Sequence, residues 1–338
     1  LTETGGYVIQ TSDGNYLLGG TTIGGTGLML KLNANFDTLW TRNFKPDGST
    51  SSQASVEDII EVADGYVIAG TYRNGTSEYD LMFSKIDFSG NFLFSRSIQF
   101  NATEFFYDME QTPDGNFVLV GRTTINNNNN DMMIVKVNGN NGNIIWGKAY
   151  GISNSSEIAR SVSVLPGGNL LVFGTRGDNG IRVLKLQGSN GNLISEFTRD
   201  VAGNPNTATK AKTDAQGNLY ILCNAEGGGI MKIDSNLVYQ WAEFQELYAS
   251  TYSQLCWDFL VLDNGFMVLG NMSQGAVGGT KSDFYLLRLD QNAKQYTCGR
   301  QQINTTLYSE PVNSFTVTVQ NSIAKTPSSL PYNYNNVQ

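Results

Sequence analysis

The chain repeats the stretch Asp64-Gly65-Tyr66-Val67-Ile68-Ala69-Gly70, in which a turn-forming aspartate and glycine precede an apolar run that ends on glycine. Two similar copies occupy 13–20 and 114–121, and three looser copies end at Gly174, Asn224 and Gly270. Successive copies are separated by about fifty residues, the period typical of a four-stranded propeller blade. The repeat therefore predicts six similar β units.

A second landmark follows in every repeat: a strand with one cation between apolar neighbours. The six cations are Lys31, Lys85, Lys136, Lys185, Lys232 and Arg288. A residue that recurs in every unit usually solves a packing problem that every unit shares. We therefore interpret the cation as structural, with its stem covering apolar surface and its head paired to a neighbouring acid such as Asp80, Asp131 or Asp283.

The turns between these landmarks divide each repeat into strands. Asn-Gly and Asp-Gly pairs tolerate the positive φ of tight hairpins, so the second repeat predicts strands A to D at 54–63, 65–73, 79–87 and 91–100. Four antiparallel strands make a blade. We expect an all-β, six-bladed β-propeller of four-stranded antiparallel blades over residues 1–303.

Residues 304–338 lie beyond the sixth repeat as a C-terminal tail with no core of its own. The alternation of Phe315, Val317 and Val319 with threonines predicts one strand at 315–319, which is our candidate assembly strand. Open sheet edges accept an added strand. The tail could dock on its own propeller or on a neighbouring subunit, and the sequence leaves both open.

Composition narrows the classes of function. The net charge of -8 and the pI near 4.7 argue against a nucleic-acid partner and against an anionic membrane surface, and no window is long and apolar enough for membrane insertion. The chain has no histidine, which removes Ser-His-Asp and Cys-His nucleophilic systems and histidine-dependent metal sites. We expect no cofactor and no metal site.

Cysteines and sequons bear on the compartment. In an oxidising compartment, Cys256 and Cys298 form the expected disulfide, since both lie in the last repeat, and three reduced thiols are the alternative. Five sequons offer N-glycosylation candidates: Asn74, Asn101, Asn154, Asn271 and Asn304. We expect Asn74 and Asn271 in B-to-C loops and the other three after strand D. The B-to-C loops and the connections after strand D emerge on the same face of a propeller. The opposite face would then carry no glycans and would be free to pack against another protein.

Carboxylates and aromatic residues supply the alternatives to a purely structural function. Paired acids could hydrolyse glycosides, and the candidates near strand A are Glu57, Asp58, Asp108, Glu110 and Asp258. The non-catalytic interpretation is that these acids pair with cations or face a water-filled channel. Exposed aromatics such as Tyr248, Tyr252 and Trp257 could instead stack on sugars in a lectin-like binder, although such residues are more often packed.

The segments 64–71 and 80–91 resemble the "DGGYVVAGYT … DAWLLKLDSNGNVLW" repeats of secreted and cell-surface β-propeller proteins. The resemblance implies an extracellular propeller that serves as a binding or structural module. The shared residues form turns and core strands, so they specify the fold and do not indicate a chemical activity. We expect a non-catalytic module, secreted or at the cell surface, that associates with other protein subunits, including itself, and with glycans. A carbohydrate-active enzyme or a lectin-like binder is the alternative.

Overall fold

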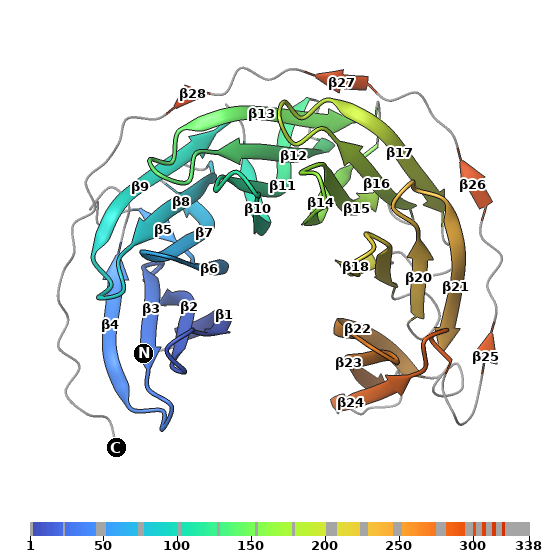
Figure 1. Cartoon of the computed structure of the whole chain (residues 1–338), viewed down its shortest axis with the longest axis horizontal. Helices are drawn as coiled ribbons and strands as arrows, with labels where there is room; N and C mark the ends of the chain where they lie inside the picture. The colour runs from blue at the N-terminus through green and yellow to red at the C-terminus, as the bar shows by residue number, and fades with distance from the viewer. Residues whose placement is uncertain are drawn as a thin grey trace. The chain divides into compact units, whose positions relative to one another are not determined.

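The computed structural model contains only strands, turns and loops among the residues that it describes (Figure 1). These residues are 3–22, 24–44, 52–73, 78–100, 103–126, 129–152, 155–177, 180–200, 208–223, 229–245, 252–274, 282–294, 300–301, 306–308, 313–315 and 320–321. Within them, no helix is long and apolar enough to cross a membrane. The chain divides into two compact units, which are described separately.

Unit 1 comprises Leu1–Gly151 and Ser314–Gln338 and holds the first three blades. Blade 1 consists of β1 (Glu3–Gln10), β2 (Tyr16–Thr22), β3 (Gly27–Leu32) and β4 (Thr38–Phe44). Blade 2 consists of β5 (Gln53–Ala54), β6 (Asp58–Val62), β7 (Gly65–Arg73), β8 (Asp80–Ile86) and β9 (Phe92–Gln99). Blade 3 consists of β10 (Glu104–Gln111), β11 (Phe117–Asn126), β12 (Asn129–Val137) and β13 (Ile144–Gly151).

Unit 2 comprises Ile152–Asn313 and holds three further sheets. Blade 4 consists of β14 (Glu157–Val164), β15 (Leu170–Arg176), β16 (Gly180–Leu186) and β17 (Leu193–Asp200). Blade 5 consists of β18 (Ala208–Thr213), β19 (Leu219–Cys223), β20 (Gly229–Ile233) and β21 (Tyr239–Gln245). Blade 6 shows β22 (Tyr252–Leu262), β23 (Gly265–Gln274) and β24 (Ser282–Leu289) in the described part of the chain.

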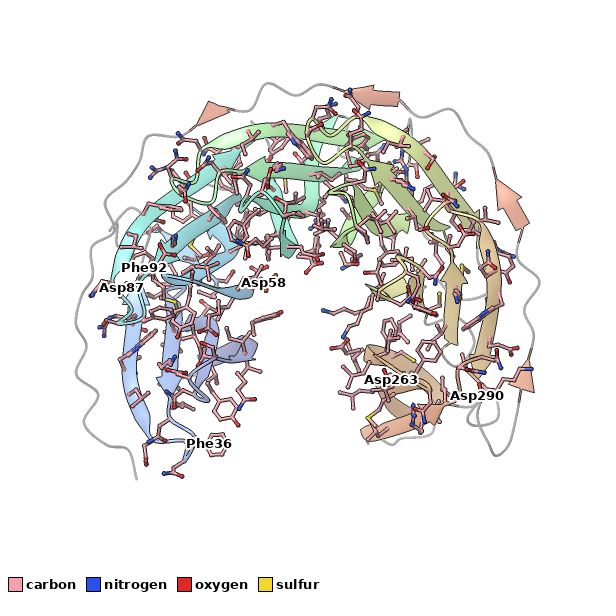
Figure 2. All side chains as sticks on the ribbon, viewed as in Figure 1. Phe36, Asp58, Asp87, Phe92, Asp263 and Asp290 are labelled. Atoms are coloured by element: carbon pink, nitrogen blue, oxygen red, sulfur yellow. The ribbon has the colours of Figure 1, made fainter. Side chains whose placement is uncertain are left out.

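The six antiparallel sheets confirm the predicted fold class, an all-β protein with six propeller blades. The predicted strands of the second repeat fall on β6, β7, β8 and β9. Asp87 shows how the predicted turns close, because its carboxylate accepts hydrogen bonds from the backbone N–H groups of Ser89 and Asn91 at 2.9 and 2.8 Å. Gly90 supplies the positive φ of 79° in this turn, and Figure 2 labels Asp87 and Phe92 at its two ends.

The apolar runs are near-continuous because the inner strands are buried on both faces. On β7, Val67 and Ala69 join the cluster shared with blade 3, whereas Tyr66 and Ile68 join the cluster shared with blade 1. Strand β8 alternates in the same way. Each strand of this kind therefore contributes side chains to two hydrophobic clusters, one on each face of its blade. These clusters join neighbouring blades within unit 1.

The glycine that ends each motif leaves room for a neighbouring carbonyl group. A β-bulge in strand A turns one carbonyl towards strand B, where a Cβ on Gly121 would lie 1.9 Å from the Phe105 oxygen and one on Gly70 would lie 2.0 Å from the Ser55 oxygen. In blade 5 the register puts Cys223, and not Asn224, at this position. Glycine is thus a steric requirement at positions 70 and 121, whereas blade 5 accommodates a cysteine side chain beside its bulge.

Four short strands follow the last blade, and each pairs with the outer strand of one blade (Figure 1). In chain order they are β25 (Arg300–Gln301) on β21, β26 (Thr306–Tyr308) on β17, β27 (Asn313–Phe315) on β13 and β28 (Gln320–Asn321) on β9. Of the candidate assembly strand, Phe315 ends β27, while Val317 and Val319 lie outside the described residues. The described tail strands therefore pair with their own chain.

Candidate functional site

The predicted glycosylation sites remain predictions. Asn74, Asn101, Asn154 and Asn304 lie outside the described residues. The expectation that Asn271 lies in a loop is wrong, because it falls within the middle strand β23, where its backbone is paired with Leu255 on one side and Phe284 on the other. In blade 6, β23 continues beyond the motif glycine Gly270 to Gln274. The turn-forming residues in the sequence did not predict this extension.

The cysteines are described only in part. Cys223 is a buried free thiol and Cys256 is also buried, whereas Cys298 lies outside the described residues, so the Cys256–Cys298 disulfide stays a prediction. Burial, with the nearby Cys256 as a second cause, raises the pKa of the Cys223 thiol well above its ordinary range. A thiol held protonated in this way is a poor nucleophile.

The cations of the first three repeats form ion pairs within their own blades, but not with the predicted acids Asp80 and Asp131. The side chain of Asp283 lies outside the described part of the chain. Lys31, Lys85 and Lys136 pair with the turn aspartate of their own blade, Asp13 at 3.2 Å, Asp64 at 2.7 Å and Asp114 at 2.7 Å. These are not the acids near the start of strand C that the sequence suggested. The A-to-B turn lies over the far end of strand C, where the ammonium groups emerge, whereas Asp80 accepts a hydrogen bond from Gln99 at 2.6 Å.

The candidate carboxylates have different environments. Asp58, labelled in Figure 2, is buried and accepts hydrogen bonds from the backbone N–H groups of Ile59 at 2.7 Å and of Met109 in blade 3 at 3.0 Å, so it ties two blades together. Asp258 caps Phe259 in the same way and lies 3.4 Å from Lys212. Of the five candidates, Glu57 alone is among the residues that line the pocket described next.

The pocket lies within unit 1, where blades 1, 2 and 3 adjoin, and has a volume of about 410 Å³. Strand A of blade 2 is interrupted between β5 and β6, and this break places Ser55 and Glu57 in the pocket wall. The Val56 N–H turns away from its own blade to the Gly20 carbonyl of blade 1, at 3.2 Å. Bulges and breaks of this kind commonly redirect side chains at binding sites.

Another part of the pocket lining is aromatic and includes one cation. The rings of Tyr79 and Phe105 lie 5.1 Å apart between centroids, tilted by 30°, and the Arg73 guanidinium lies 5.3 Å from the Tyr79 centroid. Tyr107 completes this side. Because Tyr79 precedes strand C of one blade and Phe105 lies in strand A of the next, only the fold brings them together.

Electrostatically, Glu57 is the most perturbed group in the pocket wall. Burial raises the pKa of this carboxyl above its ordinary value of 4.5, and hydrogen bonds from the Ser55 and Thr71 side chains oppose the rise. A partly desolvated carboxyl that faces a pocket gains from hydrogen-bond donors brought by a ligand. The pocket can therefore bind a polar molecule with an apolar face.

A second pocket, of about 680 Å³, lies in unit 2 beside Tyr220, Lys232 and Trp241. Lys232 differs from the first three cations because Gln216 replaces the turn aspartate, and its ammonium lies 5.2 Å from the Tyr220 ring centroid. Asp214 accepts a hydrogen bond from the Tyr220 hydroxyl at 3.1 Å. Asp214, Tyr220 and Lys232 in this pocket are thus already engaged with one another.

Sequence reasoning identified Glu57 but missed Arg73, Tyr79 and Phe105. None of these three belongs to the repeated motif, and their positions depend on contacts between blades. A usable signal would have been the residues that differ among equivalent positions of the six repeats. No metal site was expected, and the described residues contain no group of three or more cysteine, aspartate or glutamate side chains placed to hold a metal ion.

Comparisons with known proteins identify the fold. No protein-family model and no curated protein matches the chain. Two solved structures, each described as a "putative 6-phosphogluconolactonase", come from Bacteroides uniformis and Bacteroides fragilis and are 10% and 12% identical, with TM-scores of 0.52 and 0.51. Each matches 90% of this chain, and the matches cover 88% and 87% of their own chains. The similarity supports a propeller-like fold and no more.

A third structure is a protein of unknown function from Bacteroides caccae, 14% identical with a TM-score of 0.48. The match covers 87% of this chain and 98% of that chain.

Proposed function

We propose that this protein is a non-catalytic structural or adhesive binding module, secreted or displayed at a cell surface, whose copies associate through the C-terminal strands. One observation carries the proposal: the four strands β25 to β28 each cover the outer edge of a blade. An edge strand is a template for pairing with another chain. A strand that covers such an edge in its own chain can cover the same edge in a second copy.

The pairings are short, which favours exchange between copies. β26 makes three residue pairs with β17, and β25 and β28 make two pairs each with β21 and β9. Few backbone hydrogen bonds hold such a strand, so its release costs little. Exchange of an identical element between protomers is a common route to self-association.

Apolar side chains after the C-to-D turns support a packing face. Leu39, Leu93 and Ile145 occupy equivalent positions one residue into the bulged start of strand D in blades 1, 2 and 3. They are 51%, 54% and 46% exposed. Phe36 and Phe88 in the C-to-D turns of blades 1 and 2 are also exposed. Repeated exposed apolar residues on one class of turn are typical of a protein interaction surface.

The polar motif residues support a non-catalytic function, because the described ones are engaged in turns and ion pairs. Among the described residues that line the pocket of unit 1, Glu57 is the one carboxylate. Glycoside hydrolysis by paired carboxylates needs two, about 5–10 Å apart. The extracellular location is supported by the sequons and by the repeat resemblance.

Light scattering on the full chain over a range of concentrations tests the proposal. We expect concentration-dependent assemblies that are reduced by Leu307→Pro, because proline removes the backbone donor of β26 and cannot continue its ladder. Leu307→Ala keeps that donor and is the matched control. Mass spectrometry before and after removal of N-linked glycans tests the location. A protein that stays monomeric at every concentration would contradict the assembly function, and a native protein without glycan mass would contradict the glycoprotein part.

A further inference from the structure

We propose that the pocket of unit 1, lined by Ser55, Glu57, Thr71, Arg73, Tyr79 and Phe105, binds one pyranose ring of a neutral sugar. This inference adds a ligand site to the assembly function and does not depend on the C-terminal strands.

The size of the pocket fits a small ligand. Its volume of about 410 Å³ lies in the lower part of the range of about 300–1,000 Å³ found for ligand sites in proteins. The walls come from three blades of one unit, and Val56, which lies between Ser55 and Glu57, is buried and packs closely against Gly19 of blade 1. A site held by packed strands is already formed before the ligand binds.

The aromatic wall suits one face of a sugar ring. The axial C–H groups of a pyranose form an apolar face, and tyrosine and phenylalanine rings offer large apolar surfaces with little loss of side-chain freedom. The Tyr79–Phe105 pair, with centroids 5.1 Å apart, provides such a surface, and Arg73 lies against the Tyr79 ring at 5.3 Å. The guanidinium thereby fixes the ring and presents planar donors at its edge.

The polar wall suits the hydroxyl groups of the same ring. Glu57 can accept hydrogen bonds from two vicinal hydroxyls, and the Ser55 and Thr71 side chains stand beside it. A carboxyl that has already lost part of its hydration gains more from new donors than a solvated one does. A flat apolar ligand would bring no donor beyond those that Ser55 and Thr71 already supply to this carboxyl.

The charge of the pocket favours a neutral sugar. The described part of the lining contains one carboxyl group, that of Glu57, and one guanidinium, that of Arg73. An acidic sugar would meet the carboxylate and an amino sugar would meet the guanidinium, and either contact lowers affinity. A ring that carries hydroxyls alone satisfies both groups.

The test titrates the full chain by ligand-observed NMR with methyl glycosides of four neutral sugars, glucose, galactose, mannose and N-acetylglucosamine, and of the acidic sugar glucuronate. We expect saturable binding of at least one of the neutral sugars in the millimolar range, as is usual for a ligand of this size. Tyr79→Ala should weaken that binding about tenfold through loss of the aromatic face. Glu57→Gln should weaken it as well, because the amide replaces one acceptor by a donor.

Two matched controls accompany these variants. Phe36→Ala removes an exposed aromatic residue that stacks on Tyr16 outside the pocket, with centroids 5.3 Å apart. Glu61→Gln removes a carboxylate that accepts hydrogen bonds from Ser12. Neither should change sugar binding.

Three results would overturn the proposal: no saturable binding of any glycoside at tens of millimolar, binding of glucuronate alone, or binding that survives both pocket variants. If Tyr79→Ala fails to fold, the effect of Glu57→Gln on sugar binding alone decides whether the pocket is the binding site. Sugar binding retained in Leu307→Pro would separate this site from the assembly function, so the two proposals can fail independently.

Discussion

Glu104→Gln should make the stability of the protein less dependent on pH. The Glu104 side chain is fully buried at the start of β10. Burial raises its pKa from the ordinary 4.5 to about 8, against hydrogen bonds from the Thr123 hydroxyl and the Phe100 backbone, while Asp80 adds to the rise. In the folded protein, therefore, this carboxyl is mostly protonated at neutral pH.

The direction of the change in stability with pH follows from comparing the protonation of Glu104 in the folded and unfolded states. Below about pH 4.5 the carboxyl is protonated in both states and costs nothing. Between about pH 4.5 and 8 the unfolded chain releases the proton and the folded chain retains it, so stability falls as pH rises. Above about pH 8 both states are ionised and the loss is complete. The range from 4.5 to about 8 corresponds to about 5 kcal/mol, of which about 3 kcal/mol is lost by pH 7.

Glutamine is neutral at every pH, so the variant should lack this dependence. Denaturant midpoints, followed by tryptophan fluorescence at several values between about pH 4.5 and 8, give the slope for each protein. The wild type should lose about 3 kcal/mol more than Glu104→Gln between about pH 4.5 and 7. Glu61→Gln, which also removes one carboxylate, controls for the change in net charge. Equal slopes for the wild type and Glu104→Gln would refute the reasoning, whatever their absolute stabilities.

Three further predictions concern the blade architecture. Gly121→Ala should cost about 1–3 kcal/mol because its Cβ would overlap the Phe105 carbonyl, whereas Gly115→Ala, with a φ of 77° and open space around it, should cost about 1 kcal/mol; urea midpoints for the two variants compare them. Asp58→Ala should lower stability by about 2 kcal/mol because the Met109 N–H is left buried without its acceptor, and an unchanged midpoint would contradict the blade-linking contact. Cys223 should resist iodoacetamide in the folded protein and react after unfolding, as mass spectrometry of its peptide would show; fast labelling under native conditions would contradict its burial.

The fold was predictable because its signals are local. The turn that opens each motif and the near-continuous apolar run after it depend on residues close in sequence, and β7 spans 65–73 as predicted. The recurrence of one cation per repeat also indicated a structural role correctly. Its partner did not follow, because contact between Lys85 and Asp64 depends on how the A-to-B turn folds over strand C.

The candidate site was only partly predictable, for the same physical reason. Glu57 stood out as a carboxylate near strand A, but Tyr79 and Phe105 meet through a blade-to-blade contact that no spacing in the sequence records. Asp58 lies directly beside Glu57 and yet is buried in backbone hydrogen bonds, since successive strand residues point to opposite faces. Neighbours in sequence thus took on different roles.

The contact of Val56 with blade 1 limits how such a protein can evolve. A Cβ on Gly19 would lie 2.4 Å from a Val56 methyl group, and one on Gly6 would lie 2.9 Å from the Val56 carbonyl oxygen. The contacting surfaces of blade 1 and blade 2 therefore fit each other specifically, although both blades have the same repeated sequence pattern. Duplicating or shuffling one of these repeats without its neighbour would produce a steric clash. The repeats are alike in sequence, but their order along the chain is no longer interchangeable.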